Sequence, residues 1–589
     1  MTLLKRTHMC GNLRISDVNE KVTLNGWIQK SRDLGGLIFA DLRDKSGLVQ
    51  IVFKDDLPRD VLKAAESLRS EFVVGVTGTV GERESKNDHM DTGDIEIVVQ
   101  TLEIYSKAQT PPIYVKDDDV VDENLRMKYR YLDLRKPKMQ KNLEIRAKVA
   151  KLTRDYYSEH GFTEVETPML VKPTPEGARD YLVPSRVHEG SFYALPQSPQ
   201  LYKQLLMAGG TDRYMQIVKC FRDEDLRADR QPEFTQVDLE MSFVDEDDVI
   251  VIQEGYLKRI FKEVLDVDIE TPFPRLPYKE AMDRYGSDKP DIRFGFELKN
   301  LSELVKDSRF KVFSDAVANG GSVRGINIRD GADKFSRKNI DKLTDLCKAY
   351  GAKGLAWVKI TDEGINSSFS KFFDEDAMTE LTEVFSGKPN DLILIVADKD
   401  QVVYDTLGFL RREIAGRLGM LDDKEYKLLW VVDFPLLEYD EDAGRYNAKH
   451  HPFTSPNPDD LDKLESEPGD VRARAYDIVL NGVELGGGSI RIHDGDLQAG
   501  MFKVLGLSDE EVKNKFDFLL EAFKYGVPPH GGLAYGLDRL VMLLLGESSI
   551  RETIAFPKNQ AAECPVSNAP GAVSQEQLDE LGLKLKKPE

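Results

Sequence analysis

The stretch Gly532-Leu533-Ala534-Tyr535-Gly536-Leu537-Asp538-Arg539 joins a glycine-rich strand to a helix that we expect over Leu540–Leu545. A second stretch, Cys220-Phe221-Arg222-Asp223-Glu224-Asp225, ends an apolar run, and a charged loop separates it from the β-like run Glu233–Glu240. Each stretch would aim a guanidinium, which is always charged and forked for two hydrogen bonds, at a phosphate. A single arginine beside glycine is usually a surface residue, but two such settings about three hundred residues apart are far less common.

These two stretches resemble motifs 2 and 3 of class II aminoacyl-tRNA synthetases. A third segment, His160–Pro168, places Gly161 and an alternating strand after a long amphipathic helix. Helix, strand and proline together resemble motif 1, which builds the dimer interface in that family. The resemblance therefore implies an antiparallel-sheet catalytic domain and a homodimer.

Five further segments resemble bacterial-type aspartyl-tRNA synthetases of subclass IIb: Thr174–Asp180, Gln197–Lys203, Phe221–Phe234, His450–Thr454 and Gly486–Arg491. The similarity extends over essentially the whole chain. It implies ATP-dependent ligation of L-aspartate to tRNA-Asp in two steps, through aspartyl-adenylate, with release of pyrophosphate and AMP.

Composition is consistent with this class of enzyme. A chain of 589 residues with 41% hydrophobic and 31% charged residues is typical of a soluble protein of three or four domains. We find no run long enough for a membrane helix and no signal peptide. Four scattered cysteines without a CxxC pair argue against zinc and disulfides and fit the cytoplasm. The net charge of −22 excludes a non-specific nucleic-acid binder, so RNA would need a local basic face.

The N-terminal region is expected to form a small β-barrel. Its β-like runs are Val22–Ile28, Leu37–Leu42, Leu48–Phe53, Phe72–Val80 and Ile95–Ile104, with a helical segment Val61–Leu68 between the third and fourth. Five strands with a helix in that place suggest an OB-fold, and a generic small barrel is the alternative. Arg32, Phe39 and Gln50 supply a cation, a stacking ring and an amide for unpaired bases. With the resemblance, we expect the tRNA anticodon site at Arg32, Leu34, Phe39, Gln50, Asn87 and Glu96.

We expect six segments along the chain. They are an OB-fold anticodon-binding domain (1–106), a hinge linker (107–141), the first part of the catalytic core (142–290), an inserted α/β domain of GAD type (291–420), the second part of the core (421–560) and a C-terminal extension (561–589). The basic linker either follows a tRNA backbone or is a solvated connector. The function of the insertion does not follow from its residues.

Amino-acid activation requires attack of a carboxylate on the α-phosphate of ATP, so the protein supplies positioning and charge stabilisation. By the resemblance, Arg222 contacts the α-phosphate and Arg539 the γ-phosphate, and these two are the catalytic residues. The implied ATP site also includes Asp223, Glu224, Gln231, Glu484, Gly536, Leu537 and Asp538. Asp477 and Glu484 would hold Mg²⁺ with hard oxygen ligands, although two acids seven residues apart are ordinarily surface residues.

An aspartate side chain is an anion and needs cations in its pocket, which Lys203, Arg491 and His450 can provide. Family roles place Arg491 and Lys203 on the side-chain carboxylate, with Asp238 behind them as an orienting acid. Glu176, in a loop that closes over the substrate ammonium, and Gln200 complete the implied aspartate site. The pair His450-His451 could instead be structural or bind a metal, but no cysteine or third histidine lies nearby.

Three alternatives remain open. Family members that also charge tRNA-Asn often carry His where this chain has Leu34 and Gly where it has Asn87, so this chain resembles the discriminating type. Asparaginyl- and lysyl-tRNA synthetases share the barrel and core, but a lysine pocket needs acids where Arg491 lies. A catalytically inactive relative that only binds tRNA is a third interpretation. Such relatives usually lose an ATP-contacting arginine, the metal acids or the barrel.

Overall fold

The structure is a computed structural model that describes residues 3–173 and 177–586. The chain divides into two compact units. The first comprises the chain up to Lys148 together with Leu226–Gln231 and Glu547–Ser574, and the second comprises Val149–Asp225, Pro232–Gly546 and the residues from Gln575 onward.

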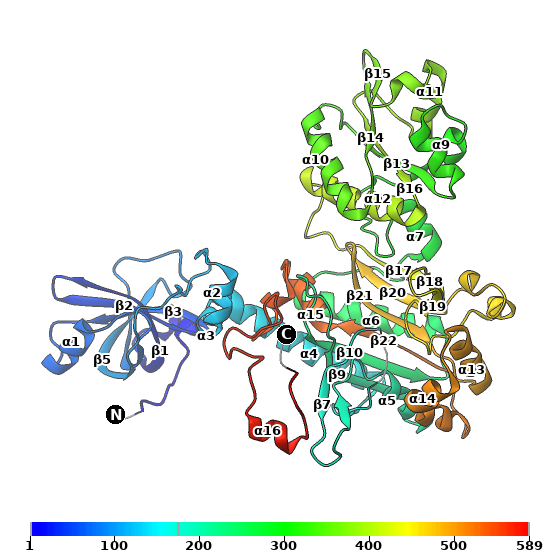
Figure 1. Ribbon diagram of the computed structural model, residues 1–589. Helices are drawn as coiled ribbons and strands as arrows, with labels where there is room; N and C mark the ends of the chain where they lie inside the picture. Colours follow the sequence, from blue (N-terminus) through cyan, green and yellow to red (C-terminus); the bar gives the residue numbers. More distant parts are fainter. Residues whose placement is uncertain (1–2, 174–176, 587–589) are drawn as a thin grey trace. The chain divides into compact units, whose positions relative to one another are not determined.

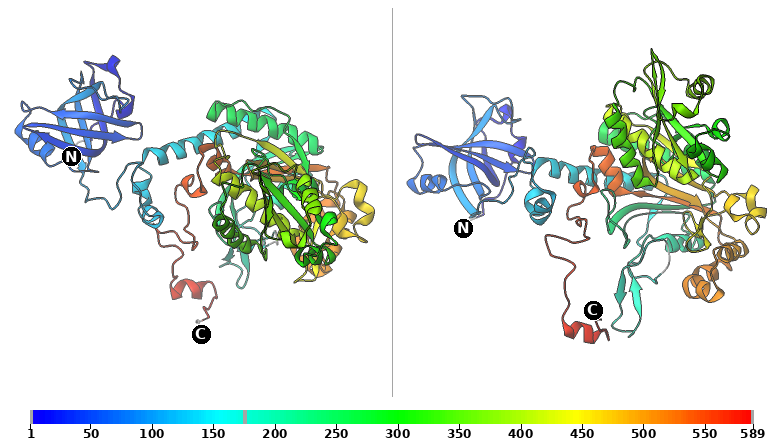
Figure 2. Two further views of the ribbon diagram at one scale, coloured as in Figure 1. Left: turned by 90° about the horizontal axis from the view of Figure 1, so that it is seen from above. Right: turned by 45° about the horizontal axis from the view of Figure 1, so that its top comes forward.

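The first unit contains a closed barrel of five strands in the order β1-β2-β3-β5-β4 (Figures 1 and 2). The strands are β1 (Lys21–Leu34), β2 (Leu37–Asp44), β3 (Gly47–Phe53), β4 (Val73–Glu82) and β5 (Ile95–Ser106), and α1 (Arg59–Glu66) lies between β3 and β4. Buried and partly buried residues alternate along β1, as expected for a strand with one face toward a core. The predicted five strands and intervening helix are confirmed, and the barrel is an OB-fold.

The predicted linker is not an unstructured connector. It contains α2 (Glu123–Lys128) and α3 (Arg130–Asp133), and the long helix α4 (Pro137–Glu159) already begins before residue 142. Some of its basic residues form internal contacts: Arg130 is buried, pairs with Asp133 at 2.7 Å and donates to main-chain carbonyls of Arg551 and Ile554. The buried ion pair of Arg130 with Asp133 and the hydrogen bonds of Arg130 hold α3 in place within the first unit.

The second unit is built on an eight-stranded sheet in the order β11-β17-β20-β21-β22-β10-β9-β6. Its strands are β6 (Thr163–Glu164), β9 (Arg213–Phe221), β10 (Glu233–Ser242), β11 (Arg275–Pro277), β17 (Leu428–Val432), β20 (Ala475–Leu480), β21 (Val483–Ile490) and β22 (His530–Gly536). All neighbours are antiparallel except the two outermost pairs, β11 with β17 and β6 with β9. The predicted antiparallel-sheet catalytic domain is confirmed.

Two predicted element boundaries in this sheet were wrong. Helix α15 (Leu537–Leu545) begins directly after Gly536, so Asp538 and Arg539 lie in its first turn. A carboxylate such as that of Asp538 is stabilised there by the positive end of the helix dipole. The strand after Gly161 is only two residues long. Beyond Glu164, one further main-chain hydrogen bond, from Val165 to Met215, continues the pairing, and Pro168 has no N–H with which to extend it.

Helices and two short hairpins surround the sheet. The helices are α5 (Gln200–Ala208), α6 (Glu246–Leu265), α7 (Tyr278–Tyr285), α13 (Gly495–Val504) and α14 (Asp509–Phe523). A further short helix, α16 (Gln575–Glu580), lies near the end of the chain. The hairpins are β7 (Leu182–Pro184) with β8 (Phe192–Ala194) and β18 (Leu437–Asp440) with β19 (Arg445–Ala448). In the part of the chain that the structure describes, no helix has the length and apolarity needed to cross a membrane.

The inserted domain belongs to the second unit and has a five-stranded sheet in the order β12-β13-β16-β14-β15. The strands are β12 (Lys299–Asn300), β13 (Ser322–Ile328), β14 (Ala356–Thr361), β15 (Gly364–Ser367) and β16 (Leu392–Asp398). Its helices are α8 (Ser302–Val305), α9 (Lys311–Ala318), α10 (Arg337–Cys347), α11 (Glu375–Val384) and α12 (Asp400–Arg417). Helices α10 and α12 cover one face and α9 and α11 the other, each over its own apolar core (Figures 1 and 2). The predicted α/β insertion is confirmed.

Candidate active site

A cavity of about 340 Å³ lies in the second unit over the central strands of the large sheet. Strands β10, β20, β21 and β22, helix α5 and the segment after β9 all contribute to its wall. Its lining residues include Gln200, Lys203, Arg222, Asp238, His450, His451, Asp477, Glu484, Ser489 and Arg491. The structure thus brings together eight residues that were predicted to bind aspartate, ATP or metal.

Four charged side chains are buried at one end of this cavity. Lys203 Nζ lies 2.7 Å from Asp238 Oδ1 and 3.1 Å from Glu240 Oε2. Arg491 donates to both oxygens of Glu240, through Nε at 2.9 Å and Nη2 at 3.2 Å, and through Nη1 to Ser489 Oγ at 2.6 Å. Each of the four residues is at most 3% exposed, so the two cations are fixed by charge pairs that replace water.

The ionisation of these groups follows from their pairing. Burial alone would raise the pKa of Glu240, but Arg491 and Lys203 hold it at about 2. Burial raises the pKa of Asp238, and the neighbouring Lys203 opposes that shift. Burial, together with the positive charge of Arg491, lowers the pKa of His451 well below its ordinary 6.5. His451 is therefore neutral near pH 7, and its Nε2 accepts a hydrogen bond from Arg491 Nη1 at 2.6 Å.

Sequence reasoning missed two members of this cluster. Asp238 was expected behind both cations, but it contacts Lys203, while Glu240 is the acid that holds Arg491. His450 was selected from the histidine pair, yet it is His451 that contacts Arg491. Glu240 could have been found, because residues two apart on a strand face the same side and Asp238 had already been placed there.

Asp477 and Glu484 lie on the hairpin formed by β20 and β21 and share the same cavity. Burial and the adjacent Asp477 carboxylate raise the pKa of Glu484, and the positive charges of Arg539 and Lys289 oppose that shift. Asp477 Oδ1 is buried without a hydrogen bond from any described residue, although His450 Nε2 lies 3.4 Å away. A side chain at Gly487 would meet this carboxylate and displace it, so glycine leaves room for Asp477 in its present position.

These two carboxylates fit a hard cation that is shared with a phosphate chain. Among the residues that the structure describes, no cluster of three or more His, Cys, Asp or Glu side chains could hold a metal ion alone. Mg²⁺ characteristically uses one or two carboxylates and takes its remaining ligands from phosphate and water. The donor set therefore suits Mg²⁺ bound together with ATP.

The two arginines predicted to contact phosphate occupy different positions. Arg222 follows β9 and lines the cavity, with its guanidinium 5.1 Å from the ring centre of Phe234. Arg539 lies in the first turn of α15 and donates through Nη1 to the main-chain oxygen of Glu484 at 2.7 Å. Asp538 is buried beside it and accepts from the main-chain N–H of Thr235, which fixes α15 to β10. Arg539 thus reaches the hairpin of β20 and β21 from the strand–helix junction that also contains Gly536 and Leu537.

The other residues that were predicted for the nucleotide and aspartate sites lie in a loop, in the first unit or on α5, and one lies outside the described residues. Asp223 and Glu224 follow Arg222 in the charged loop before β10. Gln231 belongs to the first unit, where its amide exchanges two hydrogen bonds with the main chain of Lys558, so its expected nucleotide contact stays a prediction. Gln200 is buried and bonds to Gln204. Glu176 lies outside the described residues.

The predicted anticodon residues gather on the barrel of the first unit. Arg32 is paired with Phe39 across β1 and β2, and its guanidinium lies 3.8 Å from Asp41. Gln50 is buried and donates to Glu96 at 2.8 Å. Leu34 is exposed at the end of β1, and Asn87 accepts from the main-chain N–H of His89 within the loop before β5. Apart from Leu34 and Asn87, these side chains form one polar and aromatic face.

Comparison with known families agrees with this geometry. Residues 122–560 match the family described as tRNA synthetases class II (D, K and N), and residues 22–105 match an OB-fold nucleic acid binding domain. The chain belongs to the class II tRNA synthetases. The cavity in the second unit is accordingly the candidate active site of a class II synthetase.

Several relatives are similar to this synthetase over their full length. "Aspartate--tRNA ligase" of Ruminiclostridium cellulolyticum is 60% identical, with 99% of each chain covered. "Aspartate--tRNA(Asp/Asn) ligase" of Caldanaerobacter subterraneus subsp. tengcongensis is 57% identical, covering 99% of this chain and 98% of the relative. Among solved structures, an asparaginyl-tRNA synthetase from Pyrococcus horikoshii complexed with asparaginyl-adenylate has a TM-score of 0.58 at 19% identity, covering 94% of this chain and 98% of that one. The structural likeness shows the fold alone.

Proposed function

We propose that this class II synthetase ligates L-aspartate to tRNA-Asp, forming aspartyl-adenylate from ATP and then transferring the aspartyl group to the 3′-terminal ribose. The observation that carries the proposal is the buried pair Arg491 and Lys203 at one end of a cavity whose other residues include Arg222, Asp477 and Glu484. Full-length relatives at 56–60% identity that are named Aspartate--tRNA ligase support the choice of amino acid.

The arrangement assigns a task to each group. Arg491 and Lys203, which Glu240 and Asp238 hold in place, would bind the side-chain carboxylate of aspartate. Fixed donors of this kind lose little freedom when the substrate binds, which is the advantage of preorganisation. A neutral amide would offer these cations no negative charge, and a cationic side chain would be repelled by them, so asparagine and lysine are disfavoured.

The activation step requires charge stabilisation at the phosphates. Arg222 would contact the α-phosphate, where negative charge develops as the substrate carboxylate attacks and pyrophosphate leaves. Asp477 and Glu484 would hold Mg²⁺, which neutralises phosphate charge when bound. Arg539 would contact the γ-phosphate while its Nη1 anchors the main chain of Glu484.

Recognition of tRNA is assigned to the barrel. Phe39 offers a stacking surface, and Arg32, Gln50 and Glu96 offer charge and base-edge contacts to an unpaired anticodon. The proposal includes a homodimer, by analogy with the motif 1 region. A second candidate, charging of both tRNA-Asp and tRNA-Asn, is favoured by three relatives at 55–57% identity that are named Aspartate--tRNA(Asp/Asn) ligase. Leu34 and Asn87 in this chain are the basis for preferring the discriminating enzyme.

Aminoacylation of purified tRNA-Asp and tRNA-Asn with labelled aspartate, measured side by side, tests the proposal. We expect charging of tRNA-Asp and little charging of tRNA-Asn. Equal charging of both would establish the second candidate, and charging of neither by a folded protein would exclude both.

A further inference from the structure

Helix α12 of the inserted domain packs closely against the catalytic core at the end of α7. A side chain at Gly286 would meet the main chain of Tyr404 and Gly408, and a side chain at Gly408 would meet that of Gly286. Glycine is therefore required on both sides of this contact. Tyr404 of α12 also donates to Asp283 of α7 at 2.7 Å, which fixes the rotation of the helix.

Arg411, on the same helix, is a buried cation that holds a loop of the core. It is 1% exposed, and its guanidinium lies 4.8 Å from the ring centre of Tyr285 and 4.9 Å from that of Phe294. It donates to the main-chain oxygens of Asp291, Gly295 and Phe296. The loop that follows Gly286 contains Asp288, and Arg411 of α12 thus fixes the C-terminal end of this loop.

Arg412, the next residue of α12, contacts the turn between β20 and β21. Its Nη1 donates to the main-chain oxygen of Gly482 at 3.2 Å, and its Nε lies 4.0 Å from the buried carboxylate of Asp291. Asn481 and Gly482 both have positive φ, which is the geometry of a two-residue hairpin turn. A side chain at Gly482 would lie about 3 Å from Asp291 and Arg412, so the turn is enclosed on this side.

This turn controls where Glu484 lies. Glu484 is two residues beyond Gly482, on the hairpin that also contains Asp477. Arg539 holds the main-chain oxygen of Glu484 at 2.7 Å, and Arg412 holds that of Gly482. The metal-site hairpin is therefore held by two cations, one from the core and one from the inserted domain.

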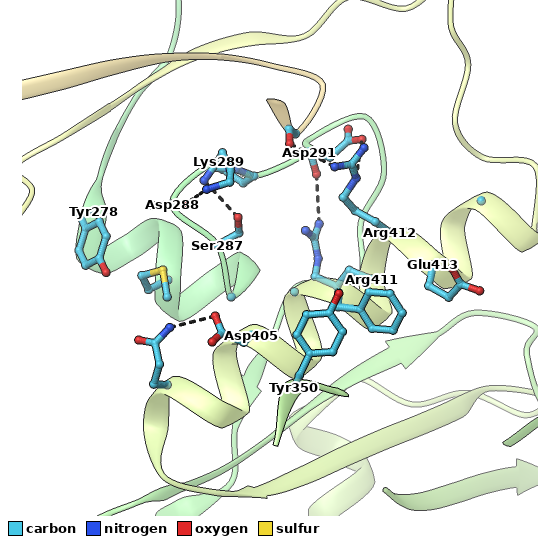
Figure 3. A pocket seen from close by; sticks show the side chains of 18 of the residues that line it. Tyr278, Ser287, Asp288, Lys289, Asp291, Tyr350, Asp405, Arg411, Arg412 and Glu413 are labelled. Carbon is cyan, nitrogen blue, oxygen red and sulfur yellow. Dashed lines mark hydrogen bonds and ion pairs between the residues drawn. The ribbon is translucent and has the colours of Figure 1, made fainter. Parts of the chain in front are cut away.

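Arg411, Arg412 and Gly482 also line a second, larger cavity of about 1410 Å³ (Figure 3). Asp288 and Lys449 line both cavities. Figure 3 shows Arg411 and Arg412 on α12 facing Asp291 and the loop with Asp288 and Lys289. The inserted domain thus contacts the edge of the active site at Gly482, two residues before Glu484 in the sequence.

We propose that helix α12 of the inserted domain braces the metal-site hairpin, and that Arg412 is a positioning residue for Glu484 acting through Gly482. The inference rests on the proposed function for its effect on activation. It gives the insertion a task in the chemistry, since Arg412 adds a contact from the inserted domain to those that Asn481 of the same turn makes with Glu425 and Lys427.

The test compares Arg412→Met and Arg412→Lys with Arg417→Met, a control on the same helix whose arginine pairs with Glu413. Hydrogen exchange of the main-chain amides of residues 477–490 is measured in the full chain without ligands, and thermal unfolding shows that each variant is folded. We expect at least about threefold faster exchange in Arg412→Met, partial restoration in Arg412→Lys and no change in the control.

The second readout is the magnesium concentration for half-maximal aspartate-dependent pyrophosphate exchange. We expect a rise of about three- to tenfold in Arg412→Met, as for loss of one partly exposed charged hydrogen bond, with a larger change in KM for ATP than in kcat. Unchanged amide exchange in Arg412→Met, or equal effects in Arg417→Met, would overturn the inference. If the wild-type protein shows no aspartate-dependent exchange, the proposed function fails, while the amide measurement still decides whether the brace exists.

Discussion

Replacement of Arg491 by leucine tests the assignment of the substrate pocket. Arg491 is 3% exposed, lines the cavity and makes contacts with Glu240, Ser489 and His451. Leucine fills part of the same volume but removes the positive charge and the donors. The substrate carboxylate would then enter a buried site in which Lys203 is the only remaining cation of the pair.

The size of the effect follows from the cost of an unpaired buried charge. Removing one partner of such a pair costs roughly 3–5 kcal/mol. At about 1.4 kcal/mol per factor of ten, this is a loss of about two to three and a half decades in kcat/KM for aspartate. KM for ATP serves as an internal control, because Arg491 is assigned to the amino acid and not to the phosphates.

The same variant has a predicted effect on stability. The pKa of Glu240 is depressed from 4.5 to about 2, so its ionised form stabilises the fold above pH 4.5, and this contribution is lost as the pH falls toward 2. The shift corresponds to at most about 3 kcal/mol, part of which Lys203 retains in the variant. We expect Arg491→Leu to unfold at lower urea concentration at pH 7, with the difference from wild type shrinking below pH 4.5.

Pyrophosphate exchange with varied aspartate, at saturating ATP, measures the kinetic effect. A change of less than tenfold in kcat/KM for aspartate, in a variant shown to be folded, would mean that Arg491 does not hold the substrate carboxylate. An equal loss in kcat/KM for ATP would instead indicate a general disturbance of the site.

Three further tests address the phosphate contact, the metal ligands and the choice of tRNA. Arg222→Ala should abolish adenylate formation without unfolding the protein, because it removes charge needed most in the transition state; near-normal exchange would refute the α-phosphate contact. Asp477→Ala and Glu484→Ala should each raise the magnesium requirement for activation, and an unchanged requirement in both would place the metal ligands elsewhere. Leu34→His combined with Asn87→Gly should increase charging of tRNA-Asn relative to tRNA-Asp; an unchanged ratio would locate the selectivity outside these two positions.

The elements of the fold were predictable where the chain repeats a simple pattern. Alternating apolar residues gave the strands of the barrel, and β-like and helix-like runs gave the elements of the insertion. The helix start at Leu537 was missed because its first turn carries polar residues whose contacts are tertiary: Asp538 binds Thr235 on another strand. The helices of the predicted linker were missed for the same reason, since Arg130 is buried through contacts more than four hundred residues away in the sequence.

The sequence predicted which residues line the site better than it predicted which charged side chains pair with each other. Motif order placed Arg222, Asp477 and Arg491 in one site, and the structure puts them in one cavity. The partner of each charge depends on register between strands that are far apart in sequence. Glu240 meets Arg491 because β10 and β21 both pair with β22, an arrangement that residue types alone do not determine. The contact of Arg412 with Gly482 has the same origin, because it joins an inserted helix to a hairpin of the core.

The most direct test of the central claim is amino-acid-dependent exchange of pyrophosphate into ATP by the purified protein, measured separately with aspartate, asparagine and lysine. We predict exchange with aspartate that requires magnesium, and exchange close to background with asparagine and lysine. A folded protein that shows no exchange with aspartate, or that exchanges as well with asparagine or lysine, would contradict the assignment of Arg491 and Lys203 to the aspartate carboxylate.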